Sequence, residues 1–254
     1  MTSRGARLVE PIIEVISGWT GVDSVAMLQS GSDPYDPYYF LSLDVYCSGD
    51  IPPASDRQSQ LRGHSAFESS NVSPKDRFFM GETPIRLEYK DTSRFDELVT
   101  AAVEGHPRFR DAGTYPFYRL STAEIVFSRS DWIIRIREAL AGLPDLFWQN
   151  LRDNQQGRAE HTFSDLSAAA YRNDELFFIV SAGRFMRSLA GFLFAINRTF
   201  QPSYRLLTED LLALPQLPSS FSVRLESFIR QDSQLSMEQR RELAELMIKS
   251  VLSL

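Results

Sequence analysis

The sequence contains one cysteine, Cys47, and three histidines that lie far apart, His64, His106 and His161. A single cysteine excludes an intrachain disulfide framework and a thiolate zinc site, and the histidines lack the spacing of metal ligands. No run reaches the roughly 18 to 20 apolar residues that span a bilayer. The first residues, MTSRGARLVEPIIEV, also lack the uninterrupted apolar region of a signal peptide. We therefore expect a soluble, cytoplasmic protein with no membrane partner.

Several nucleotide and hydrolase motifs are absent as well. The chain has no Gly-x-Ser-x-Gly elbow, no Walker-type Gly-Lys-Ser/Thr loop and no Gly-x-Gly-x-x-Gly fingerprint. Positive charge is scarce, because 27 Lys and Arg face 33 Asp and Glu, which gives a net charge of −6. This balance argues against general nucleic-acid binding, which depends on neutralising phosphates. A local basic pocket remains compatible with it.

The composition is that of an ordinary globular protein. Of the 254 residues, 43% are hydrophobic and 24% are charged. The length is large for one core and comfortable for two. At about residue 118 the hydrophobic pattern becomes helical and stays so, which predicts a domain boundary between residues 117 and 118.

The first part of the chain mixes helical and strand patterns. Apolar residues recur at helical spacing over 8–19 and 94–103. Between residues 49 and 75 the polar composition predicts an irregular excursion with at most a short helix over 56–61. Strands are predicted over 23–28, 40–46, 77–80 and 83–89.

The second part predicts helices alone. The longest is expected over about 174–200, and Ser236 with Gln239 forms a capping-box pattern before the last one. The other predicted helices begin after Ser130 or Asp131, run from Pro144 through Leu151, and cover 163–172, 206–212 and 222–230.

Three features carry chemistry. Gly31-Ser32 forms a turn after the first predicted strand, Asp44 lies between Leu43 and Val45 in the second, and Glu88 lies on the polar face of a later strand. Each has a plainer interpretation: an ordinary turn, an aspartate exposed on an edge strand, and a solvated strand face. A charge within an apolar strand nevertheless needs a partner or a purpose.

The order of these elements resembles the nucleotidyltransferase superfamily, which includes DNA polymerase β and the aminoglycoside nucleotidyltransferases. The run NRTFQPSYR at residues 197–205 and the LPQLP after it are similar to the helical domain of small bacterial members. The resemblance implies an α+β fold. A small mixed β-sheet nucleotidyltransferase-like domain over 1–117 would be followed by an all-α helical-bundle domain over 118–254.

The resemblance also implies a reaction. A nucleoside triphosphate would bind with Mg²⁺, and a nucleotidyl group would pass to a small-molecule or protein acceptor. Asp44 and Glu88 match catalytic carboxylates that ligate the metal, with Glu88 as ligand or general base. Gly31 and Ser32 match the turn whose backbone and hydroxyl approach the phosphates.

In the helical half, the resemblance places Asn197, Tyr204 and Arg205 toward the nucleotide, with Arg205 near the phosphates as a cation. Arg205 can equally be a surface salt-bridge partner. Further candidate cations are Lys90, Arg184 and Arg187.

The sequence departs from the family at one position. Where the family has an aspartate two residues before the second carboxylate, this chain has Ser42, and a serine binds magnesium more weakly. Asp33 or Asp36 could compensate from the loop. The alternative function is a catalytically degenerate module for nucleotide sensing or protein interaction with the same fold. A further rival is a helical protein whose second half mediates assembly.

Overall fold

The computed structural model describes residues 4–29, 36–70, 74–107, 113–230 and 235–254. Two compact units form, each from two stretches of chain. The sheet unit comprises Met1–Val103 and Pro116–Gly142, and the helical unit comprises Glu104–Tyr115 and Leu143–Leu254. The boundary predicted at 117/118 falls inside helix α4 (Tyr115–Thr122), and the stretch up to Gly142 groups with the sheet.

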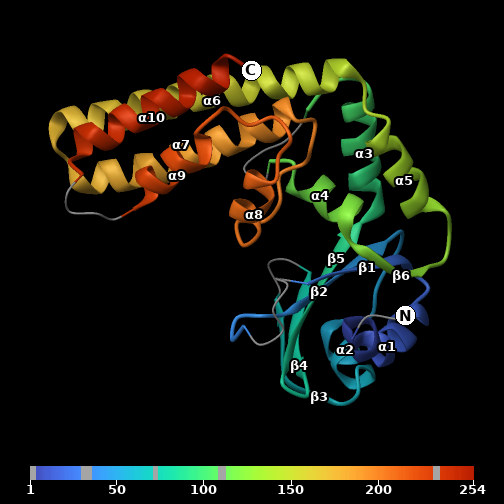
Figure 1. Cartoon of the computed structure of the whole chain (residues 1–254). Helices are drawn as coiled ribbons and strands as arrows, with labels where there is room; N and C mark the ends of the chain where they lie inside the picture. Colours follow the sequence, from blue (N-terminus) through green and yellow to red (C-terminus); the bar gives the residue numbers. More distant parts are fainter. Residues whose placement is uncertain (1–3, 30–35, 71–73, 108–112, 231–234) are drawn as a thin grey trace. The chain divides into compact units, whose positions relative to one another are not determined.

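The sheet unit is built on a six-stranded mixed sheet in the order β3-β4-β5-β2-β1-β6 (Figure 1). Strands β2 and β5 pair in parallel, and the other neighbours pair antiparallel. The strands are β1 (Val22–Gln29), β2 (Leu41–Cys47), β3 (His64–Ser70), β4 (Lys75–Met80), β5 (Thr83–Asp91) and β6 (Glu124–Ser128). The α+β prediction is therefore confirmed.

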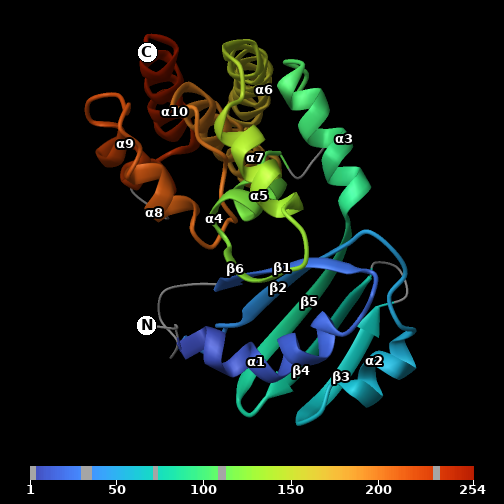
Figure 2. The same cartoon turned by 90° about the vertical axis from the view of Figure 1, so that its right-hand side faces the viewer.

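One face of the sheet carries the main apolar core of this unit. Helix α1 (Arg4–Ser17) buries Val9, Ile12 and Ile16, and these pack in one cluster with residues of the strands such as Leu43 and Leu87. Helices α1 and α2 (Ala54–Gln60) lie against this same face (Figure 2). The 3.6-residue period of α1 meets the two-residue period of the strands, so apolar side chains from both fill one layer.

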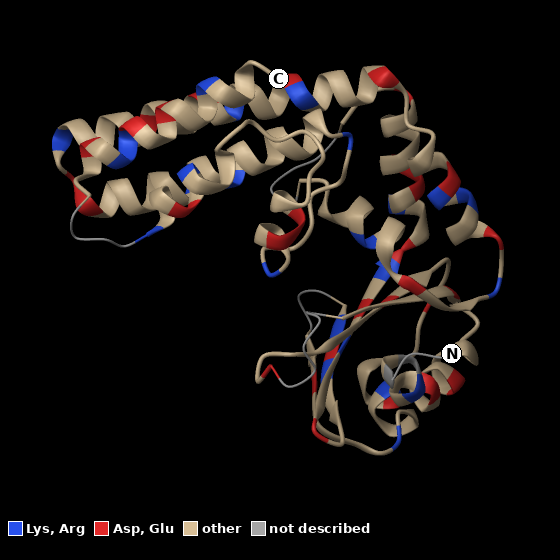
Figure 3. Cartoon of the chain, viewed as in Figure 1, with Lys and Arg blue, Asp and Glu red and all other residues tan. Residues whose placement is uncertain are grey.

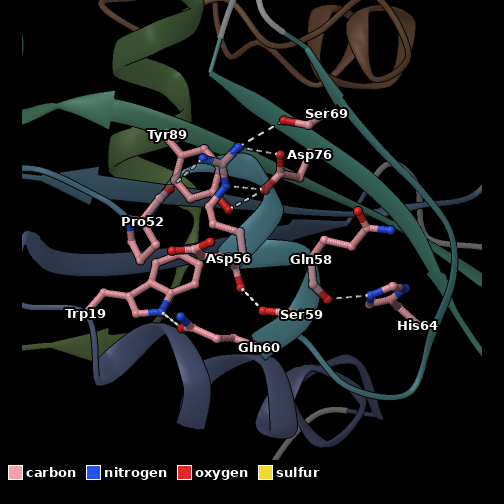
Figure 4. A network of polar contacts seen from close by, with 11 residues as sticks. Trp19, Pro52, Asp56, Gln58, Ser59, Gln60, His64, Ser69, Asp76 and Tyr89 are labelled. Atoms are coloured by element: carbon pink, nitrogen blue, oxygen red, sulfur yellow. Dashed lines mark hydrogen bonds and ion pairs between the residues drawn. The ribbon is translucent and has the colours of Figure 1, made fainter.

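A buried polar cluster on the same face ties α2 to the sheet (Figure 4). Arg57 donates from Nε and Nη2 to the two carboxylate oxygens of Asp76, each at 2.8 Å, and from Nη1 to the carbonyl of Pro52. The Tyr89 hydroxyl donates to Asp76 at 2.7 Å, and Ser69 accepts from Arg57 at 3.0 Å. Every charge in this cluster has a partner, which is the condition for burying charges.

The remaining helices of the unit cover the part of the opposite face around Tyr46, whereas Arg77 and Phe79 of β4 on that face are exposed. Tyr46 of β2 is fully buried there between Phe95 of α3 (Thr92–Val103) and Trp132 of α5 (Trp132–Ala141). The ring centroids lie 5.4 Å and 5.1 Å from that of Tyr46. This packing, together with the pairing of β6 to β1, explains why residues 116–142 belong to the sheet unit.

Two strands were not predicted from the sequence. β3 lies in the stretch expected to be irregular, and its burial is too low to leave a clear apolar alternation. β6 lies among helical patterns and is only five residues long. Both are edge strands, which are commonly short and polar, and their structure depends on a neighbour that is distant in the sequence.

The helical unit centres on a pair of long helices, α6 (Asp145–Arg172) and α7 (Glu175–Ile196), which pack along each other (Figure 1). α6, with 28 residues, is longer than α7, with 22, so the prediction that the helix near 174–200 is the longest was wrong. The helices predicted over 144–151 and 163–172 are one helix, because its polar middle keeps a buried side at Leu151 and Ala159.

The remaining helices complete this unit: α8 (Leu207–Leu212), α9 (Phe221–Ile229) and α10 (Met237–Leu252). The capping box predicted before α10 is confirmed, since Ser236 and Gln239 exchange side-chain and backbone hydrogen bonds. Within the described residues, α7 is the single helix long and apolar enough to cross a membrane, and 56% of its most apolar window is buried.

Candidate functional site

The two candidate carboxylates lie side by side on the sheet. Asp44 of β2 and Glu88 of β5 are direct partners in the parallel register, and Ser42 lies two residues before Asp44 on the same face. β2 is an interior strand and Asp44 is fully buried, so the interpretation of Asp44 as an exposed edge residue was wrong. Glu88 keeps 26% of its side chain exposed. Strand alternation and the parallel register thus place these three side chains close together on one face of the sheet.

Arg119 from α4 holds Asp44. Its Nε donates to one carboxylate oxygen at 2.7 Å and its Nη2 donates to the other at 2.5 Å. The same Nη2 donates to the Ser42 hydroxyl at 2.8 Å. This paired geometry is the strongest contact that a guanidinium forms with a carboxylate. The serine that replaces the expected carboxylate is therefore a hydrogen-bond acceptor for Arg119.

A second cation, Lys90, lies between the two carboxylates. Its Nζ is 2.7 Å from Asp44 Oδ1 and 3.7 Å from Glu88 Oε2. The opposite side of Glu88 approaches Lys75, with Nζ 3.3 Å from Oε1. Lys90 also lines a cavity of about 450 Å³ at the carboxyl ends of β2 and β5. Such strand ends are where ligands commonly enter sheets with parallel strands.

The burial of this cluster shifts the pKa of its members. Burial raises the pKa of Asp44, but the charges of Lys90 and Arg119 outweigh burial and hold that pKa below its usual value. Burial lowers the pKa of Lys90, and Asp44 opposes that shift only in part. The pKa of Tyr46 is raised, first by burial and then by the nearby Asp44 charge. Asp44 therefore stays ionised at neutral pH.

This donor set does not fit a divalent cation in the arrangement observed. Magnesium needs free oxygen donors around it, whereas both oxygens of Asp44 accept from cations and the Lys90 ammonium lies between Asp44 and Glu88. Across the ranges that the structure covers, no three His, Cys, Asp or Glu side chains group as metal ligands. The metal roles of Asp44 and Glu88 stay predictions that require Lys90 to move.

Cations extend along the same face of the sheet. Arg86 precedes Glu88 by two residues on β5. Arg77 of β4 is the direct partner of Arg86 in the antiparallel register. The Arg86 guanidinium lies 3.6 Å from the centroid of the Phe40 ring. Figure 3 shows positive and negative residues interspersed along these strands. The cationic face, defined as Lys75, Arg77, Arg86, Lys90 and Arg119, surrounds the carboxylates.

The loop before β2 is described in part. Gly31, Ser32 and Asp33 lie outside the described residues. Asp36 accepts a hydrogen bond from the backbone N–H of Tyr38 at 2.8 Å, so its carboxylate stabilises a local turn. The phosphate-binding role of Gly31 and Ser32 stays a prediction.

The other candidates belong to the helical unit. Asn197 ends α7, where its side chain donates to Leu193 and exchanges two hydrogen bonds with the backbone of Gln216. Tyr204 is 63% exposed, and the Arg187 guanidinium lies 5.8 Å from its ring centroid. Arg205, beside Tyr204, is exposed. The nucleotide contacts predicted for Asn197, Tyr204 and Arg205 stay predictions.

Arg119 is the site residue that sequence reasoning missed. It follows Tyr118 in the run Thr114 to Leu120 and is 6% exposed, although arginine is rarely buried without a partner. Its position between apolar residues was a usable signal. The identity of its partner was not, since Asp44 lies 75 residues earlier.

Comparisons with known proteins bear on the fold. No protein-family model matches the chain. No curated protein matches it either. Among solved structures, a nucleotidyltransferase-like protein from Exiguobacterium sibiricum is similar, with a TM-score of 0.52 and 12% identity. The likeness covers 98% of this chain and 74% of that one. The fold is therefore nucleotidyltransferase-like, a mixed sheet joined to a helical region.

Proposed function

We propose that this chain is a nucleotidyltransferase-like protein that binds a nucleoside triphosphate through cations, without a divalent metal, and uses binding for sensing rather than transfer. One observation carries the proposal: both oxygens of the Asp44 carboxylate are bonded to cations, to Arg119 through each oxygen and to Lys90 through one of them. Because the resemblance implies that Asp44 would ligate a metal ion, cations already bonded to Asp44 favour a metal-free mode of binding.

The charge of the sheet face supports an anionic ligand. Its five cations outnumber the three carboxylates on the same face of β2 to β5, Glu68, Asp44 and Glu88, although the whole chain is acidic. Arg86 and Lys75 are half-buried, which strengthens their interaction with a phosphate relative to fully hydrated side chains. Local cations can therefore bind phosphate on an acidic protein.

The predicted contacts complete the proposal. Gly31 and Ser32 would donate hydrogen bonds to the phosphates from backbone amides and a hydroxyl, and Arg205 would donate from its guanidinium. Asn197 and Tyr204 would contact the rest of the nucleotide. A small-molecule or protein acceptor enters only if transfer occurs.

The direct test is calorimetry with the four common nucleoside triphosphates, each in EDTA and in excess Mg²⁺. We expect at least one triphosphate to bind with the same affinity in both buffers, and no pyrophosphate to form with candidate acceptors. No binding in either buffer would overturn the proposal. Binding that requires Mg²⁺ and releases pyrophosphate would instead establish the transferase that the resemblance implies.

A variant pair tests the site itself. Arg86→Gln removes one cation from the sheet face and should weaken triphosphate binding about tenfold, the size of one charge-assisted hydrogen bond. Arg135→Gln is the matched control, because Arg135 is an exposed cation of α5 that pairs with Asp131. Equal affinities for the two variants would place the ligand elsewhere.

A further inference from the structure

Helix α7 carries an apolar stripe on its solvent side. Leu176, Ile179 and Val180 are 74%, 67% and 51% exposed, whereas Phe178 and Phe185 on the other side are fully buried. Gly183 continues the stripe one turn later. We call Leu176, Ile179, Val180 and Gly183 the α7 stripe. Contiguous exposed apolar side chains of this kind mark interaction surfaces.

No contact within the described part of the helical unit explains why residue 183 is a glycine. A Cβ built at this position would meet no atom within 4 Å of the described chain. Glycine weakens the interior of a helix relative to alanine. A glycine retained on an exposed stripe allows another backbone to approach closely, so the stripe has the shape of a helix-docking surface.

The charges around the stripe identify its occupant. Glu175 lies at its amino-terminal end, and Arg184 and Arg187 lie at its carboxy-terminal end, all exposed. We propose that a second copy of this chain packs its α7 stripe antiparallel on the first, across a two-fold axis between Val180 and Gly183. This surface is complementary to itself, as a two-fold interface requires.

The antiparallel register follows from helix geometry. Glu175 and Arg187 are twelve residues apart and nearly equidistant from the axis. Glu175 of each copy therefore lies beside Arg187 of the partner subunit, and Val180 packs on Gly183 of the partner subunit. A parallel arrangement would place like charges together, which is unfavourable. The proposal does not depend on the cationic face of the sheet unit.

Sedimentation of the full chain over a range of concentrations tests the assembly. We expect a monomer–dimer equilibrium that Gly183→Leu shifts to monomer, because the new side chain fills the space for the partner helix. Gly157→Leu is the control, since Gly157 of α6 also has nothing within 4 Å of a Cβ. A wild-type chain that stays monomeric at its solubility limit would overturn the proposal.

Charge reversal tests the register. Glu175→Arg should weaken the dimer about tenfold, since two symmetric pairs become repulsive, and the double variant Glu175→Arg with Arg187→Glu should restore it. Circular dichroism confirms that each variant is folded. Failure of the double variant to restore association would overturn the antiparallel arrangement. Stripe-dependent binding to phosphatidylcholine vesicles by a monomeric chain would assign the surface to lipid and also overturn it.

Discussion

Arg119 determines how much the buried charge of Asp44 destabilises the sheet unit. Because the two residues form a paired contact inside the protein, we expect Arg119→Gln to lower the free energy of unfolding by about 3 to 5 kcal/mol. Urea unfolding measures this change. Arg135→Gln breaks an exposed pair with Asp131 and should cost less than about 1 kcal/mol. Similar losses in both variants would contradict a buried role for Arg119.

The buried aspartates also predict a pH dependence. Burial raises the pKa of both Asp44 and Asp76. The charges of Lys90 and Arg119 nevertheless hold the pKa of Asp44 below its usual value of 3.8. The hydrogen bonds from Arg57 do the same for the pKa of Asp76. The unfolded chain therefore takes up protons first as pH falls. The stabilisation is present above about pH 4 and is lost progressively below it. Urea unfolding at several pH values checks this, and a midpoint unchanged down to about pH 2 would contradict it.

At this scale the sequence revealed residues but not their partners. Asp44 stood out because it is a charge in an apolar strand, and Glu88 was assigned to the polar face of a later strand, but their pairing in one register came from the structure. Arg119 was not connected to it, because contacts across 75 residues leave no mark in local periodicity. The cationic surroundings that distinguish this site from a metal centre therefore became visible only in the structure.

At the scale of elements, alanine substitutions at two glycines are expected to change the free energy of unfolding in opposite directions. A Cβ on Gly21 would overlap the backbone carbonyl of Asp50, so Gly21→Ala should destabilise the sheet unit by about 1 to 3 kcal/mol. Gly157→Ala in α6 meets no neighbour and should stabilise the helical unit by about 0.5 to 1 kcal/mol. Urea unfolding compares them. A neutral Gly21→Ala would show that the 49–50 segment yields to the added methyl.

Element prediction succeeded where apolar periodicity was strong and failed where it was not. Strands β1, β2 and β5 have well-buried faces and were predicted within a few residues. β3 and β6 owe their structure to pairing at the edges of the sheet. The polar middle of α6 hid its continuity, since few of its residues there face the core. Apolar periodicity in the sequence reflects burial, so it does not identify elements that are weakly buried.

At the scale of the whole molecule, the division into units predicts which fragments fold. A fragment of residues 1–142 contains the entire sheet unit and should unfold cooperatively in urea. A fragment ending at residue 117, the boundary suggested by the sequence, lacks β6, α5 and Arg119 and should not. Circular dichroism and tryptophan fluorescence follow both transitions. Cooperative unfolding of the shorter fragment with an equal midpoint would contradict the grouping.

The fold class was predictable as a whole, because strands come first and helices follow. The assignment of residues 116–142 was not, since α4 and α5 have the same helical pattern as the second half. Their place is decided by pairing of β6 with β1 and by contacts of Trp132 with Tyr46. Such non-local contacts define a unit independently of the pattern in its sequence.

The chain passes between the two units three times, after Val103, after Tyr115 and after Gly142. This path sets an order during synthesis on the ribosome. Asp44 is translated 75 residues before Arg119, an interval of about 4 to 15 seconds at about 5 to 20 residues per second. Over the last 28 of those 75 residues, from Asp91 to Arg119, the nascent chain has both β2 and β5 but neither a complete α4 nor the edge strand β6. Completion of the sheet unit is therefore a late event, set by the arrival of residues that belong to its end.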